Sequence, residues 1–83
     1  MKTENIFYKH IGTGNIYRVI SRDAMMECPV TDMWWTAVEY EEYKHLKEDG
    51  TYVHVSEPRR FIRTDHRFSL RFKSCQENGE ENI

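Results

Sequence analysis

The run of residues 33–43, MWWTAVEYEEY, constrains the fold most, because both tryptophans of the chain stand side by side in it. Successive side chains of a β-strand point to opposite faces, so Trp34 and Trp35 cannot enter one core from the same strand. We predict a strand here, with Trp34 buried and Trp35 half exposed. An alternative buries both, one in the core and one under the loop of residues 23–32. The face expected to be buried is the more β-branched and aromatic, and comprises Trp34, Thr36, Val38 and Tyr40.

Two turn signals divide the rest of the N-terminal part. The sequence GTGN at 12–15 separates two β-rich segments, 5–11 and 16–22, and predicts a hairpin between them. Asp49-Gly50 is a second hairpin signal, followed by a strand over 51–57 that Pro58 ends. Residues 23–32 are predicted to be a loop into which the preceding strand can continue.

The C-terminal third alternates between apolar and basic residues. Phe61 and Ile62 are expected to reach the core from a helical turn, and residues 67–73 are expected to form the last strand. That strand would turn Phe68, Leu70 and Phe72 inward and its basic side chains outward. From residue 75 onward the chain is polar and acidic.

These segments predict a mainly β fold, either a small antiparallel SH3-like barrel or a rolled five-stranded sheet, with at most a short helical turn. Closing the sheet into a barrel would reduce the length of unpaired strand edge that a short β protein must otherwise protect from pairing with other chains. We expect one β domain over residues 1–74 and an acidic mobile tail over 75–83. The residues expected to be buried include Tyr17, Val19, Trp34, Val38, Phe68, Leu70 and Phe72.

The segment order resembles the bacterial family known as domain of unknown function 1653, over roughly residues 7–73. The first hairpin and the long strand match through Tyr8, His10, Gly14, Tyr17, Val19, Val38 and Tyr40. The later segments match through Tyr52, Val53, Pro58, Phe61, Arg71 and Phe72. The family's Lys-Gly turn is replaced by GTGN, and the run YVHVSEP has altered spacing. The resemblance implies an SH3-like fold and no particular activity, and a viral relative, such as a phage protein, is an equal alternative.

Composition and motifs point away from catalysis. The 83 residues suffice for one small domain, and the histidines and cysteines lie too far apart in sequence for a typical zinc site. No nucleophile motif or phosphate loop is present. Two cysteines, Cys28 and Cys75, do not make a disulfide framework, and no signal peptide or membrane-spanning run is visible. We expect a cytoplasmic protein that is not an enzyme and uses no metal or cofactor.

Charge is distributed unevenly although the net charge is only −2. Residues 50–74 are basic and residues 23–49 are acidic, which suggests two binding hypotheses. In the first, a binding module meets an anionic partner, either nucleic acid or an acidic protein surface, through Arg59, Arg60, Arg63, Arg67, Arg71 and Lys73. In the second, a small viral inhibitor or adaptor binds a host protein through an acidic and aromatic face formed by Trp35, Glu39, Glu41 and Glu42. Both hypotheses require a macromolecular partner, and neither involves a membrane. A homodimer is a further alternative.

Overall fold

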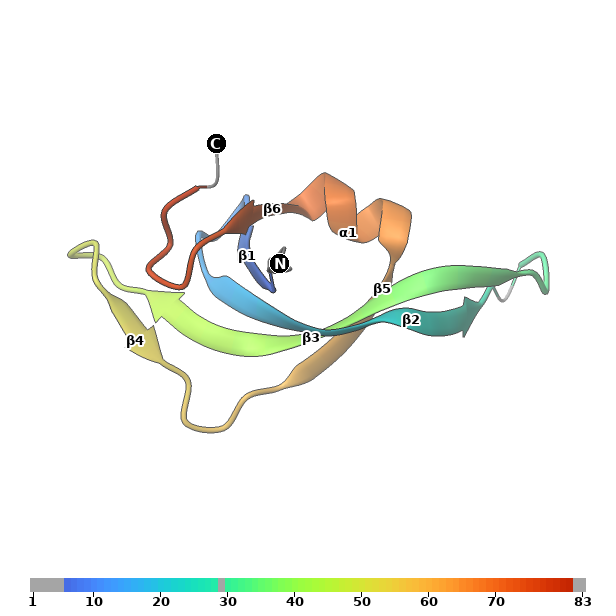
Figure 1. Ribbon diagram of the computed structural model, residues 1–83, viewed down its shortest axis with the longest axis horizontal. Coiled ribbons are helices and arrows are strands. Elements are labelled where there is room, and N and C mark those ends of the chain that lie inside the picture. The colour runs from blue at the N-terminus through green and yellow to red at the C-terminus, as the bar shows by residue number, and fades with distance from the viewer. Residues whose placement is uncertain (1–5, 29, 82–83) are drawn as a thin grey trace, which may run out of the picture.

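The computed structural model describes residues 6–28 and 30–81 and consists of one curved antiparallel sheet with a short helix (Figure 1). The predicted mainly β class is confirmed, with six strands in place of five. Within the described residues the sheet is open and does not close into a barrel. The elements are β1 (Phe7–His10), β2 (Ile16–Glu27), β3 (Trp34–Leu46), β4 (Tyr52–His54), β5 (Arg60–Thr64), α1 (Asp65–Arg71) and β6 (Phe72–Cys75).

The two long strands β2 and β3 form the centre of the sheet. Neighbouring strands follow the order β4-β3-β2-β1-β6, and β5 pairs separately with β3. Both predicted hairpins are present, β1 with β2 and β3 with β4. The β2–β3 register shifts near Tyr17, Val19 and Ser21, and such bulges bend a sheet locally. In Figure 1 the chain accordingly curls, so that β1, β6 and α1 lie above β3.

The core is small and aromatic. Val38, Tyr40, Phe68 and Phe72 are buried together, and the Phe68 and Phe72 rings stack with centroids 4.4 Å apart. Burial of Val38, Phe68 and Phe72 is therefore confirmed. The sequence also predicts burial of Tyr17 and Val19. They are half-buried and pack against this cluster.

The expected last strand is in fact helix α1 followed by β6. Thr64 caps the helix by accepting a hydrogen bond from the Arg67 N–H at 3.3 Å. Phe68 in α1 and Phe72 at the start of β6 are buried against each other, whereas Leu70 is exposed, so its predicted burial is wrong. Phe61 and Ile62 belong to β5, not to a helical turn.

β2 and β3 extend beyond the rest of the sheet as a two-stranded arm, which we define as residues 23–28 and 30–36. In it, Met25 to Glu27 pair with Trp34 to Thr36, and no other described strand pairs with these residues. The arm projects to the right in Figure 1. Trp34 is 60% exposed, so its predicted burial is wrong: the strand continues past the core, where nothing in the described chain covers its face. Trp35 is half exposed, as predicted.

Residues 75–81 return along the sheet. Cys75 is buried and forms a bridge with Glu81, and the Tyr43 hydroxyl donates to Glu77 Oε1 at 2.5 Å. Gly79 has φ 88° and lies against Tyr52, where a Cβ would come within 2.6 Å of the ring. These contacts extend the domain past residue 74, whereas the mobility expected for the tail stays a prediction. Residues 82–83 lie outside the described chain.

No helix in the described chain has the length and apolar character needed to cross a membrane.

Candidate binding groove

A groove of about 900 Å³ lies between the arm and the start of α1. We call it the arm groove. The arm contributes apolar side chains together with Glu27, and β5 and α1 contribute Arg63, His66 and Arg67 together with Asp65. The residues that matter for the argument are Met26, Trp35, Phe61, Arg63, His66 and Arg67.

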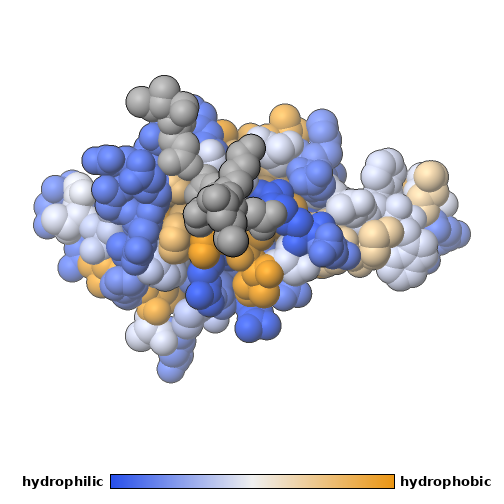
Figure 2. Space-filling model, in the orientation of Figure 1, coloured by the Kyte–Doolittle hydropathy of each residue, from blue (hydrophilic) through white to orange (hydrophobic). Residues whose placement is uncertain are grey.

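The arm itself is unusually apolar for a surface projection. Figure 2 shows it at the right with mostly pale to light-orange side chains, in contrast to the blue groups nearer the centre. Soluble monomers rarely expose large contiguous apolar patches unless these serve an interaction, and a lone two-stranded ribbon is only marginally stable. The arm is therefore the part of the surface with the strongest character of an interface. Its exposed large apolar residues are Met25, Val30, Met33, Trp34 and Trp35.

Trp35 is only partly covered by its own chain. Met26 stands directly opposite it in the β2–β3 register, and thioether sulfur packs favourably beside aromatic rings. Even so, 48% of Trp35 is exposed, which leaves a large aromatic surface on the groove wall.

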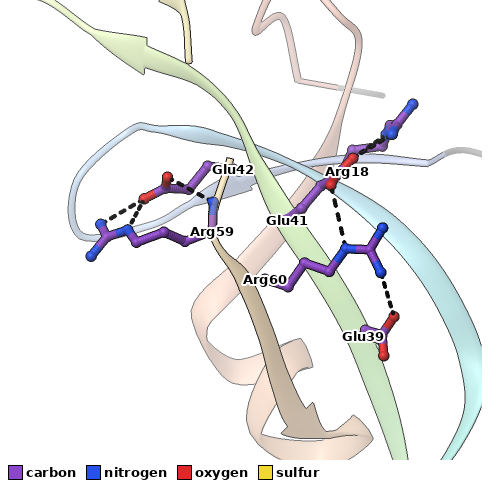
Figure 3. A network of polar contacts seen from close by, with 6 residues as sticks. All are labelled: Arg18, Glu39, Glu41, Glu42, Arg59 and Arg60. Atoms are coloured by element: carbon purple, nitrogen blue, oxygen red, sulfur yellow. Dashed lines mark hydrogen bonds and ion pairs between the residues drawn. The ribbon is translucent and has the colours of Figure 1, made fainter. Parts of the chain in front are cut away.

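The two sets of charged residues predicted as alternative binding faces are largely paired with each other. Arg59 binds Glu42, and Arg60 lies 3.8 Å from Glu41 and 4.0 Å from Glu39 (Figure 3). The Glu41 carboxylate also accepts a hydrogen bond from Arg18. An acidic strand and a basic strand of one sheet thus neutralise each other, so Arg59, Arg60 and the three glutamates are poor candidates for contacting a partner.

Glu42 is the most buried of these carboxylates. The hydrogen bonds from the Arg59 side chain hold the pKa of Glu42 below its usual value, although burial opposes the shift. The same contacts raise the pKa of Arg59. This pair is a structural link between β3 and the start of β5.

The remaining basic residues divide between the groove and the opposite end of the domain. Arg63 Nε donates to the Tyr40 hydroxyl at 2.7 Å. Lys73 lies 4.0 Å from Glu81 and directly opposite Lys9. Within residues 6–28 and 30–81, no carboxylate approaches Arg63, Arg67 or Arg71 to ion-pair distance.

The fold thus unites members of both predicted sets. Arg63 and Arg67 come from the basic set and Trp35 from the alternative set, and all three line the arm groove. Sequence reasoning missed Phe61 and His66 as groove residues. The placement of His66 depends on the turn from β5 into α1, which no local pattern indicates.

Nowhere in residues 6–28 and 30–81 do three His, Cys, Asp or Glu side chains gather in a way that could hold a metal ion. The one perturbed thiol near the groove is Cys28, whose pKa is lowered to about 7, chiefly by the Thr31 side chain. It stands at the end of the arm, where the backbone groups of Thr31 and Val30 lower its pKa further.

Comparison with known proteins returns no match to a family model, a curated protein or a solved structure. The resemblance to the domain of unknown function 1653 family therefore stays a prediction.

Proposed function

We propose that the chain is a small non-enzymatic binding module that holds an acidic segment of a partner protein in the arm groove. One observation carries the proposal: the half-exposed Trp35 lines this groove together with Arg63 and Arg67. Neither of these two arginines has a carboxylate partner among the described residues. Tryptophan and arginine are the residue types most enriched at interface hot spots.

A protein partner is favoured over nucleic acid by the charges. Arg59 and Arg60 are neutralised within the sheet, and the whole chain has a net charge of −2. Nucleic-acid-binding domains commonly carry a continuous basic stripe. Apolar side chains on the arm, which would be left uncovered by a phosphate backbone, also suit a protein surface.

An acidic host-binding face remains the weaker alternative. It would require Glu39, Glu41 and Glu42 to reach a basic partner, yet Glu41 and Glu42 are nearly buried and all three approach arginines. The part of that hypothesis that the proposal keeps is the aromatic contact through Trp35.

The test is affinity capture on the purified protein after nuclease treatment, with three variants compared. We expect one stoichiometric protein partner that resists nuclease, is lost with Trp35→Ala and Arg67→Glu, and is retained with Leu70→Ser. Leu70 is a matched control because it is also exposed and apolar but lies on α1, outside the groove lining. Loss of the partner on nuclease treatment, or equal capture by all variants, would contradict the proposal.

A further inference from the structure

The edge of β3 that borders the arm groove is open. β5 pairs with β3 from Glu41 to Ala37, where Ala37 stands opposite Thr64. The chain then turns into α1 at Asp65, so it leaves the ladder. Within the described residues, no strand pairs with Trp34 to Thr36 on this side.

The unpaired backbone groups of this edge can be assigned. The Cys28 N–H donates to the Met33 carbonyl at 2.8 Å, so the Met33 carbonyl points toward β2. Backbone groups of successive residues point to alternate edges of a strand. The N–H and C=O groups of Trp34 and Thr36 therefore point away from β2, toward the position that β5 would occupy if it continued past Thr64.

The two faces of this edge differ in chemistry. Arg63 stands opposite Val38 and donates to the Tyr40 hydroxyl, so it lies on the face of Val38 and Tyr40. Trp35 is an odd number of residues from Val38 and Tyr40 along β3, so its side chain points to the opposite face of the sheet. Met26, which pairs with Trp35 in the β2–β3 register, lies on that same face. A strand added here would place alternate side chains near an arginine and near an indole.

We propose that the partner segment binds by β-strand addition to Trp34–Thr36 of β3, as an extended peptide that alternates acidic and apolar residues. Main-chain hydrogen bonds hold the strand, acidic side chains face Arg63 and Arg67, and apolar side chains cover Trp35 and Met26. This inference rests on the proposed function and adds the mode of binding and the partner's sequence pattern.

The first experiment uses a short acetylated and amidated peptide that alternates valine and glutamate, titrated against the full chain with tryptophan fluorescence as the readout. The same peptide with lysine in place of glutamate is the charge control. We expect the glutamate peptide to bind about tenfold or more tightly than the lysine peptide, and Arg67→Glu to reverse that order. Equal affinity of the two peptides, or no binding of the glutamate peptide, would overturn the inference.

The second experiment tests the hydrogen bonds. Thr36→Pro removes an N–H that faces the open edge, a position where strands tolerate proline. Met25→Pro is its matched control, because Met25 stands opposite Thr36 and presents its N–H at the other edge of the arm. We expect Thr36→Pro to weaken binding about tenfold or more and Met25→Pro to leave it within about twofold.

A third experiment modifies the peptide and leaves the protein unaltered, so its result does not depend on whether a protein variant folds. Methylating alternate backbone nitrogens of the peptide gives two isomers, and only one of them blocks the hydrogen bonds to β3. We expect that isomer alone to lose binding. Equal affinity of both isomers would overturn strand addition.

The failure of this inference is distinguishable from failure of the proposed function. If Trp35→Ala and Arg67→Glu abolish capture of an acidic partner while Thr36→Pro does not, the groove binds its partner without adding a strand. Concentration-dependent self-association in sedimentation that Thr36→Pro abolishes would assign the edge to a second copy of the chain. Displacement of the peptide by oligothymidylate would assign the groove to nucleic acid. Each of these three outcomes overturns the inference.

Discussion

The Glu42 carboxylate is almost buried in the sheet, whereas the Arg59 guanidinium that neutralises it lies mostly in solvent. Arg59 Nε and Nη2 donate to Glu42 Oε1 at 2.9 and 2.6 Å, and the Arg59 backbone N–H donates to Oε2 at 3.2 Å. A buried charge without its partner is far more costly than an exposed one. The two residues should therefore respond differently to substitution.

We expect Arg59→Ala to lower the free energy of unfolding more than Glu42→Gln does. The first variant leaves a buried carboxylate with only a backbone donor, and the second leaves an arginine that water can solvate. Urea unfolding of both variants and of the double variant measures the difference, and the double variant should resemble Glu42→Gln. Equal losses in the two single variants would contradict the assignment of burial.

The same pair predicts a loss of stability in acid. The pKa of Glu42 is lowered in the folded protein, chiefly by the Arg59 side chain, while the unfolded chain titrates near the ordinary value of about 4.3. The unfolded state therefore binds the proton more readily, and the stabilisation is complete above that value and is lost as pH falls toward the folded pKa. We expect the free energy of unfolding to fall less steeply below about pH 4.3 in Glu42→Gln than in the native chain.

Phe68 and Leu70 should behave as opposites although they stand two residues apart. Phe68 is buried and stacks on Phe72, whereas Leu70 is exposed on α1. Phe68→Ala should cost about 3–5 kcal/mol, which is comparable with the whole stability of many small domains. Leu70→Ala should change stability by no more than about 0.5 kcal/mol. Circular dichroism during heating checks both, and similar melting of the two variants would mean that α1 is wrongly oriented.

The spacing of the apolar residues in α1 and β6 explains why the sequence wrongly predicts a strand over residues 67–73. Phe68 and Phe72 are four residues apart, a spacing that fits one face of a strand and one face of a helix equally well. The intervening Leu70 completed an alternating pattern and favoured the strand. The Thr64 cap, with Asp65 in the first turn and Arg71 in the last, favours a helix, and sequence reasoning missed this signal.

The arm shows a different limit of sequence reasoning. Alternation identified the strand that carries Trp34 and Trp35, and both hairpins followed from glycine-containing turns. Burial, however, depends on which neighbouring strands reach a residue. β5 ends its pairing at Ala37, and no local pattern around Trp34 records that endpoint. The cross-strand pairing of Arg59 with Glu42 is equally non-local, and it removes one candidate binding residue from each of the two predicted sets.

The last prediction concerns the thiol at the end of the arm. The pKa of Cys28 is lowered to about 7, first by the hydrogen bond from the Thr31 side chain and then by the backbone N–H groups of Thr31 and Val30. Burial instead raises the pKa of Cys75. Because the thiolate is the nucleophile, iodoacetamide at neutral pH should alkylate Cys28 first, with a rate that rises through a midpoint near its pKa of about 7.

Thr31→Val should raise the pKa of Cys28 and slow its alkylation at neutral pH, because the thiolate loses its strongest hydrogen bond. Thr51→Val is the matched control, since Thr51 makes a comparable side-chain hydrogen bond, to Asp49, at the β3–β4 turn. Mass spectrometry of the two cysteine-containing peptides over a pH series measures both rates. Faster modification of Cys75 than of Cys28 in the folded chain, or an unchanged midpoint in Thr31→Val, would show that the hydrogen bonds at the end of the arm do not form in solution.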